Sequence, residues 1–82
     1  MESARVLVVD DEESIRHMLS MSLSKDGFYV WTAGSGREAL NMLQKGERFD
    51  FCVTDVRMPG MDGLAFIHEA QRLGDRSPTF IA

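Results

Sequence analysis

The stretch Arg5-Val6-Leu7-Val8-Val9-Asp10-Asp11 (residues 5–11) decides the fold of this 82-residue chain. Its apolar run is continuous rather than alternating, which is typical of a parallel strand covered by helices on both faces. Two acidic residues follow the run directly. In open parallel α/β sheets the functional crevice lies beyond the carboxyl ends of the strands. The stretch therefore predicts a covered strand with candidate functional carboxylates at its end.

Three further β-like runs recur at similar spacing, at residues 28–32, 51–54 and 79–82. Helix-like segments separate the runs at residues 12–25, 36–45 and 63–73, and their apolar faces include Met18 and Leu64 at helical spacing. Strands that alternate with helices imply right-handed crossovers and a parallel sheet. The predicted fold class is therefore α/β, in three αβα layers.

The ends of the predicted helices carry recognisable cap residues. Ser35 with Glu38 three residues later predicts a capping box, and Asp62 stands where an N-cap of the third helix belongs. At the other ends, the predicted left-handed C-caps are Gly27, Gly46 and Gly74. None of these glycines has the spacing of a phosphate-binding loop.

Composition excludes several classes of function. The chain is 44% hydrophobic and 27% charged, which indicates one small globular domain. Its formal net charge of −4 provides no basic face for a nucleic acid, so direct DNA or RNA binding is not expected. Its apolar runs are far shorter than the roughly 20 residues of a membrane span. With Cys52 as the single cysteine and no signal-peptide pattern, a cytoplasmic location is expected, without contact to a membrane.

Asp10, Asp11 and Asp55 are the candidate site residues. If the first and third strands are neighbours, these carboxylates converge, and their mutual repulsion favours a bridging cation. Oxygen ligands of this kind suit Mg²⁺. A carboxylate beside Mg²⁺ can act as a nucleophile toward phosphorus, and Asp55, alone at its strand end, is the candidate. A purely structural alternative is that Asp11 and the glutamates after it stabilise a helix macrodipole, although it leaves Asp10 and Asp55 unexplained.

Two segments together resemble the receiver domain of two-component response regulators. They are Val8-Val9-Asp10-Asp11-Glu12 (8–12) and Asp55-Val56-Arg57-Met58-Pro59-Gly60-Met61-Asp62-Gly63 (55–63), and the resemblance extends over all 82 residues. It implies a flavodoxin-like sheet of order 2-1-3-4-(5), in which the fifth strand and the last two helices are missing from this chain. Residues 1–82 are accordingly expected to form the N-terminal, incomplete portion of a receiver domain.

The resemblance also implies a role for each matching residue. Asp55 would be the phosphoacceptor and the catalytic residue, and Asp10, Asp11 and Asp55 would bind Mg²⁺ together with the backbone carbonyl of Arg57. The implied phosphoryl donor is a histidine kinase or a phosphotransfer protein, and the implied output is an effector domain in the parent chain, of transcriptional type. The Ser or Thr and the Lys that complete the switch in this family would lie beyond Ala82.

Two other functions also use an acidic site of this kind or a receiver-like fold without it. A Mg²⁺-dependent phosphohydrolase could form an aspartyl-phosphate intermediate on Asp55, but such enzymes usually carry a second Asp two residues later, where this chain has Arg57. A phosphorylation-silent interaction module would normally show a damaged acidic pocket. The missing elements also predict a partly bare sheet face and an apolar edge around Phe80 and Ile81.

Overall fold

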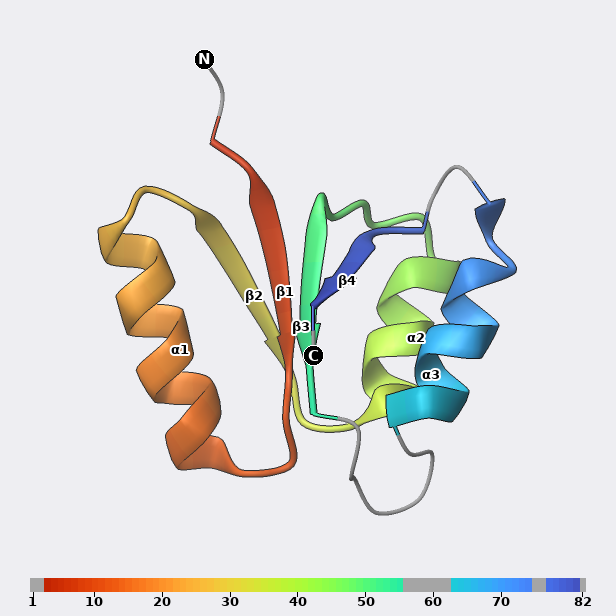
Figure 1. Ribbon diagram of the computed structural model, residues 1–82, viewed down its shortest axis with the longest axis horizontal. Helices are drawn as coiled ribbons and strands as arrows, with labels where there is room; N and C mark the ends of the chain where they lie inside the picture. The colour runs from red at the N-terminus through yellow and green to blue at the C-terminus, as the bar shows by residue number, and fades with distance from the viewer. Residues whose placement is uncertain (1–2, 56–62, 75–76, 82) are drawn as a thin grey trace.

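Strands and helices alternate along the whole chain (Figure 1). This computed structural model describes residues 3–55, 63–74 and 77–81. The strands are β1 (Arg5–Val9), β2 (Tyr29–Ala33), β3 (Phe51–Thr54) and β4 (Thr79–Ile81), and the helices are α1 (Glu13–Lys25), α2 (Gly36–Gln44) and α3 (Gly63–Gln71). The predicted elements are all present, and the largest shift in a strand is one residue, in β2.

The four strands form one parallel sheet in the order β2-β1-β3-β4. Val9 at the end of β1 is opposite Ala33 of β2 on one side and Thr54 of β3 on the other. Figure 1 shows α1 on one face of the sheet and α2 with α3 on the opposite face. This arrangement confirms the predicted three-layer α/β fold and the strand order 2-1-3-4.

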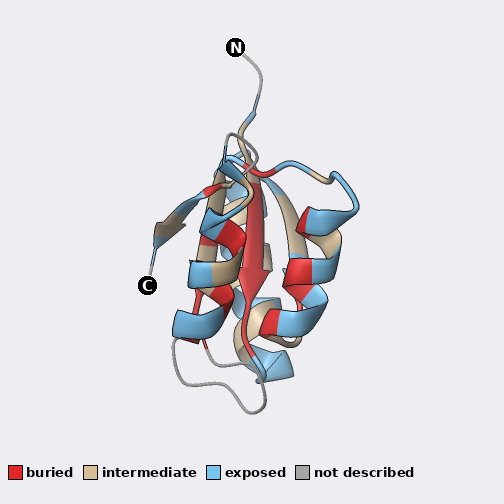
Figure 2. Ribbon diagram, turned by 90° about the vertical axis from the view of Figure 1, so that its right-hand side faces the viewer, coloured by how far each residue is buried: buried red, intermediate tan, exposed pale blue. Residues whose placement is uncertain are grey.

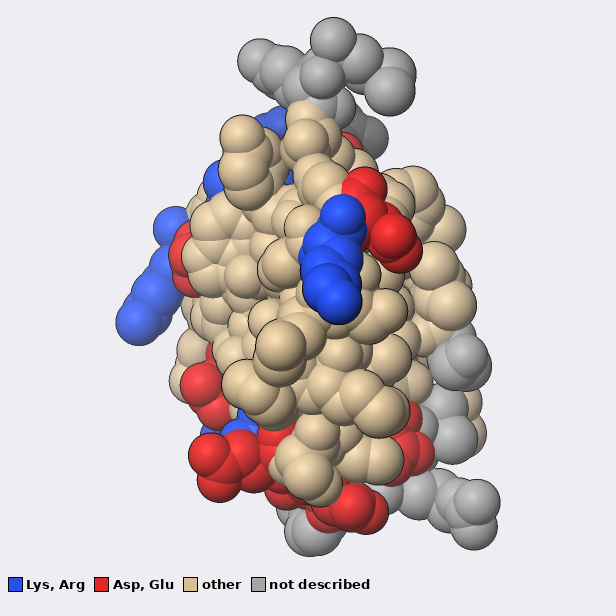
Figure 3. Space-filling model, turned by 90° about the vertical axis from the view of Figure 1, so that its left-hand side faces the viewer, with Lys and Arg blue, Asp and Glu red and all other residues tan. Residues whose placement is uncertain are grey.

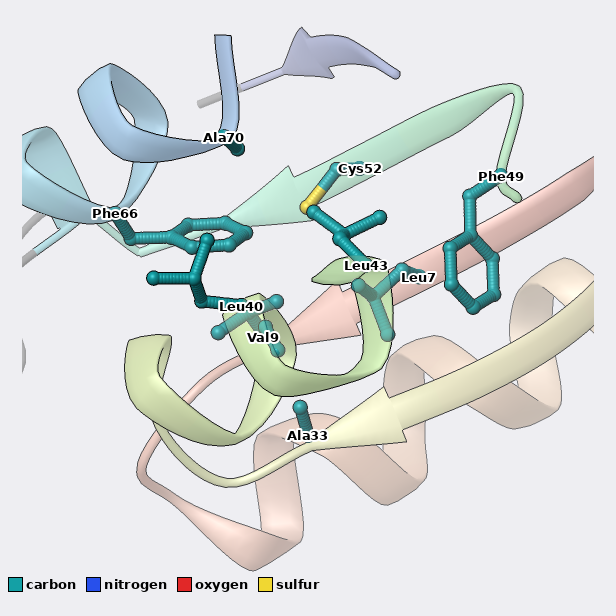
Figure 4. Packing of buried hydrophobic residues seen from close by; sticks show 10 residues of the cluster. Leu7, Val9, Ala33, Leu40, Leu43, Phe49, Cys52, Phe66 and Ala70 are labelled. Atoms are coloured by element: carbon teal, nitrogen blue, oxygen red, sulfur yellow. The ribbon is translucent and has the colours of Figure 1, made fainter. Parts of the chain in front are cut away.

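The main hydrophobic core lies between the sheet and the α2–α3 pair (Figures 2 and 4). Leu7 and Val9 alternate with Val6 and Val8 along β1, so each strand contributes to both faces. Phe66 of α3 is fully buried, and its ring meets that of Phe80 edge to face at 5.7 Å between centroids. The fully buried members of this core are Leu7, Ala39, Leu43, Cys52, Phe66 and Ala70.

The helix α1 lies by itself on the other face and contains no buried residue among those described. Met18, predicted for the apolar face of this helix, is 59% exposed, so that prediction is wrong. The prediction that Leu64 lies on the apolar face of α3 is also wrong, because Leu64 is 68% exposed. The inner face of α3 is formed by Gly63, Phe66 and Ala70. Both errors arise because a single neighbouring layer buries only a narrow stripe of a helix.

The α1 face of the sheet is only partly covered. Val6 and Val8 are buried, whereas Ile81 is 47% exposed at the edge strand β4. An apolar hollow of about 180 Å³ opens on this face and is lined by Val6, Leu23, Phe28, Phe51, Val53 and Ile81. The prediction of a partly bare face with an apolar edge is confirmed for Ile81. Phe80 instead packs against the main core on the opposite face.

The helix ends largely follow the predicted cap chemistry. The Ser35 hydroxyl accepts the backbone N–H of Glu38 at 3.1 Å, while the Glu38 carboxylate accepts the N–H of Gly34 at 2.9 Å instead of that of Ser35. The three predicted C-cap glycines, Gly27, Gly46 and Gly74, have positive φ angles of 94°, 99° and 64°. Asp62, the predicted cap of α3, lies outside the described residues.

Candidate functional site: a carboxylate cluster at the sheet edge

Two aspartates stand directly beyond the ends of adjacent strands. Asp10 follows β1, and its backbone N–H donates to the carbonyl of Ala33 at 3.2 Å. Asp55 follows β3, and its backbone N–H donates to the carbonyl of Val9 at 3.1 Å. The sheet ladder thus continues one residue past each strand, and the backbone of both aspartates is fixed by the sheet itself.

The side chain of Asp10 is also held in place. The residue is only 8% exposed, and its Oδ1 accepts the backbone N–H of Glu12 at 2.9 Å. The Asp10 carbonyl accepts a hydrogen bond of 2.7 Å from Nη1 of Arg16. The N–H of Glu12 gives the buried carboxylate a hydrogen-bond donor, which reduces the desolvation cost of its burial.

The carboxylates of Asp10, Asp11 and Asp55 form one cluster. Each offers an oxygen atom, and these three atoms all lie within 4.8 Å of one another. The predicted convergence is therefore observed for all three residues. Arg57, whose carbonyl was the fourth predicted ligand, lies outside the described residues.

The donor set of this cluster fits a hard divalent cation. Three carboxylates at this spacing repel one another, and the repulsion is relieved when a cation lies between them. The described donors are all oxygen atoms, without a thiolate or imidazole, which is the chemistry that Mg²⁺ prefers. Asp11 is exposed, so this part of the cluster is in contact with solvent.

The helix-macrodipole alternative accounts for only part of this acidic region. Glu13 lies in the first turn of α1, where a negative charge is stabilising, but the N-cap Glu12 makes no side-chain capping bond. Figure 3 shows a group of acidic side chains at the end of the molecule where α1 begins. Asp10 precedes α1, and Asp55 follows β3. The macrodipole of α1 therefore does not explain why the carboxylate oxygens of these two residues approach one another.

Two residues that support the cluster were not among the predicted site residues. Arg16 occupies the polar face of α1 in the sequence pattern, yet it is half-buried and donates to Asp10. Thr54 is 3% exposed and its hydroxyl donates to the carbonyl of Asp55 at 3.1 Å. A signal for Thr54 existed, because a polar residue in a continuous apolar strand needs a local hydrogen-bond partner.

The sequence of the chain matches a known family. Residues 6–82 match the model of the response regulator receiver domain. The chain belongs to this receiver domain family. This match confirms the resemblance to the receiver domain of two-component response regulators.

Curated relatives of this receiver domain carry the name response regulator MprA. The protein from Mycolicibacterium vanbaalenii is 42% identical over 77 residues, which is 94% of this chain and 33% of that protein. The protein from Mycobacterium tuberculosis H37Rv is 42% identical over 79 residues, 96% of this chain and 34% of its own length. The chain thus spans about a third of the length of the relatives it matches.

Solved structures share the same fold. The response regulator TrrA from Thermotoga maritima, solved in complex with Mg²⁺ and BeF, has a TM-score of 0.80 and 38% identity over 90% of this chain and 62% of that chain. The chemotaxis response regulator CheY4 of Vibrio cholerae has a TM-score of 0.79 and 45% identity over 84% of this chain and 57% of its own.

Across residues 3–55, 63–74 and 77–81, the receiver domain has no helix with the length and apolar character needed to span a bilayer.

Proposed function

We propose that this receiver domain accepts a phosphoryl group on Asp55 in the presence of Mg²⁺. The observation that carries the proposal is the cluster of carboxylate oxygens from Asp10, Asp11 and Asp55 within 4.8 Å. TrrA, a response regulator of similar fold, was solved with Mg²⁺ and BeF. This chain has the oxygen donors that Mg²⁺ requires.

Each residue of the cluster has a distinct part in the proposed reaction. Asp10 and Asp11 hold the cation with Asp55, and the backbone carbonyl of Arg57 is the further proposed ligand. Mg²⁺ bound there would offset the negative charge of the incoming phosphoryl group. A carboxylate oxygen of Asp55 attacks the phosphorus in line; the new O–P bond forms as the bond to the leaving group breaks, and the leaving group keeps that electron pair.

The proposed donor is the phosphohistidine of a histidine kinase or phosphotransfer protein, from which the P–N bond breaks. The domain then acts as a phosphoacceptor in a relay rather than as an enzyme with a separate substrate. Because curated relatives extend over about three times the matched length, we further propose that an effector domain of transcriptional type follows in the parent chain. The cytoplasm, where such kinases present their phosphohistidine, is the proposed location.

The proposal is tested by mass spectrometry of the intact protein after incubation with Mg²⁺ and acetyl phosphate, a small donor that replaces the kinase. We expect a single phosphoryl adduct that requires Mg²⁺ and is absent in Asp55→Asn. Asp26→Asn is the matched control, because Asp26 is an exposed aspartate at the far end of α1, and it should keep the adduct.

Three results would overturn the proposal. Sustained release of phosphate over many turnovers would indicate the phosphohydrolase alternative. The absence of an adduct, in protein shown to be folded by circular dichroism, would indicate a phosphorylation-silent module. An adduct that persists in Asp55→Asn would place the phosphoryl group on another residue.

A further inference from the structure

Arg16 joins the acidic cluster to two connecting segments of the fold. Its Nη1 atom donates to the carbonyl of Asp10 at 2.7 Å, from α1 back to the residue that follows β1. The same atom lies 3.4 Å from the position that a Cβ atom would take at Gly34, in the turn between β2 and α2. Figure 1 places the β1–α1 connection, the β2–α2 turn and the end of β3 at one end of the molecule.

The contact with Arg16 completes the fixation of Asp10. The N–H of Asp10 is bonded to Ala33, its carbonyl to Arg16 and its Oδ1 to the N–H of Glu12. Among the described residues no hydrogen bond reaches Oδ2, so that atom is the one left for a cation. The orientation of Oδ2 thus depends on bonds made by every other polar group of Asp10.

We propose that Arg16 is a positioning residue for the cation site: through its bond to the carbonyl of Asp10, it holds the Asp10 carboxylate in the orientation that binds Mg²⁺. The inference rests on the proposed function, since it assigns a role in the same site. Arg16 is half-buried, and the planar, fixed donors of its guanidinium suit a positioning role.

The sign of the effect separates positioning from simple electrostatics. Arg16 is a cation near a cation site, so its charge alone opposes Mg²⁺ binding, and its removal would tighten binding. Loss of a residue that orients a metal ligand weakens binding instead, typically by 10- to 100-fold in known sites. A weaker Mg²⁺ affinity after removal of a positive charge is therefore specific to the positioning role.

The experiment measures the Mg²⁺ dissociation constant by titration, with the amide NMR signals of residues 10–13 as the readout, in the unmodified protein and in Arg16→Met. We expect Arg16→Met to weaken binding by about tenfold. Arg16→Lys should show an intermediate affinity, because one ammonium cannot both reach Asp10 and fill the space beside Gly34. Arg37→Met is the charge control: Arg37 is exposed on α2, and its loss should leave the affinity unchanged or slightly tighter.

Thermal unfolding without Mg²⁺ accompanies each titration. A merely structural role would lower the melting temperature of Arg16→Met and leave the dissociation constant unchanged, which would overturn the inference, as would tighter binding. If Arg16→Met does not fold, Arg16→Lys decides, and wild-type affinity in that variant overturns the inference. If the unmodified protein binds Mg²⁺ saturably and Asp55→Asn weakens that binding, the proposed function stands even where the role of Arg16 is overturned. No saturable binding by the unmodified protein would overturn the proposed function itself.

Discussion

The backbone N–H of Asp55 donates to the carbonyl of Val9 at 3.1 Å, and Val9 is the residue directly before Asp10. This hydrogen bond fixes the position of Asp55 relative to Asp10 along the direction of the strands. A register shift of one residue between β1 and β3 would turn one of the two side chains to the opposite face. The site is therefore a consequence of strand register, and its geometry is as rigid as the central pair of strands.

Repulsion within the cluster leads to a first prediction. Asp10→Asn should raise the free energy of unfolding without Mg²⁺ by about 1 kcal/mol, because it removes one of three neighbouring charges. Asparagine keeps an oxygen that can accept the N–H of Glu12, so the local hydrogen bond is preserved. The same variant should lose the increase in melting temperature that Mg²⁺ gives the unmodified protein. Urea unfolding with and without Mg²⁺ measures both effects.

Asp50→Asn provides the control for this prediction. The Asp50 carboxylate also accepts a backbone N–H, that of Arg5 at 2.7 Å, but it lies before β3, at the other end of the sheet. This variant should gain no stability and should keep the response to Mg²⁺. Unchanged or lower stability of Asp10→Asn, with the Mg²⁺ response retained, would contradict the idea of a strained anionic cluster.

Most of the fold could be predicted from sequence because its signals are local. Continuous apolar runs such as that of β1 indicate strands covered on both faces, and Ser35 with Glu38 marks the start of α2. Asp10, Asp11 and Asp55 could be predicted as a cluster because residues after neighbouring parallel strands meet at one edge. These inferences need only periodicity, cap chemistry and the rule that places strand ends together.

The failures concern properties that depend on tertiary neighbours. Helical spacing placed Met18 on an apolar face, but the extent of burial depends on how many layers lie against α1, and Met18 is exposed. The role of Arg16 could not be predicted, because its partner is a backbone carbonyl, and the sequence carries no signal for a particular carbonyl acceptor. Arg57 remains a prediction, since it lies outside the described residues.

A second prediction compares the same substitution at two helical leucines. Leu43 of α2 is fully buried, so Leu43→Ala should lower the free energy of unfolding by about 2–5 kcal/mol through lost burial and a residual cavity. Leu64 of α3 is 68% exposed, so Leu64→Ala should change the free energy of unfolding by less than about 0.5 kcal/mol. Chemical denaturation of both variants measures the difference. Equal losses at the two positions would show that the inner face of α3 includes Leu64 after all.

A third prediction concerns the N-cap of α2. The Ser35 hydroxyl accepts the N–H of Glu38, and Ser35→Ala should lower the free energy of unfolding by about 1 kcal/mol. Ser22→Ala is the matched control, because Ser22 is an exposed serine inside α1, where alanine has the higher helix propensity. It should be neutral or slightly stabilising. A loss in Ser22→Ala as large as that in Ser35→Ala would remove capping as the explanation.

A fourth prediction follows from the buried thiol of β3. Cys52 has no exposed surface, and burial raises the pKa of its thiol from 9.0 to about 12. The folded protein therefore keeps this proton to a higher pH than the unfolded chain. The resulting contribution to stability is fully present below pH 9 and is lost as the pH rises from about 9 toward 12. Cys52 should also resist alkylation by iodoacetamide at pH 9 until urea unfolds the protein.

Urea midpoints at pH 8 and pH 10.5 test the sign of this linkage against Cys52→Ala. The alanine variant loses side-chain packing at both pH values, so its stability should be lower throughout, but it has no thiol to titrate. Between the two pH values the unmodified protein should lose more stability than the variant, by an amount on the order of 1–2 kcal/mol. The variant and the unmodified protein differ only at residue 52, so the contributions of all other groups cancel in the comparison. Equal losses would mean that the thiol ionises in the folded protein as readily as in the unfolded chain, and rapid alkylation of the folded protein would lead to the same conclusion.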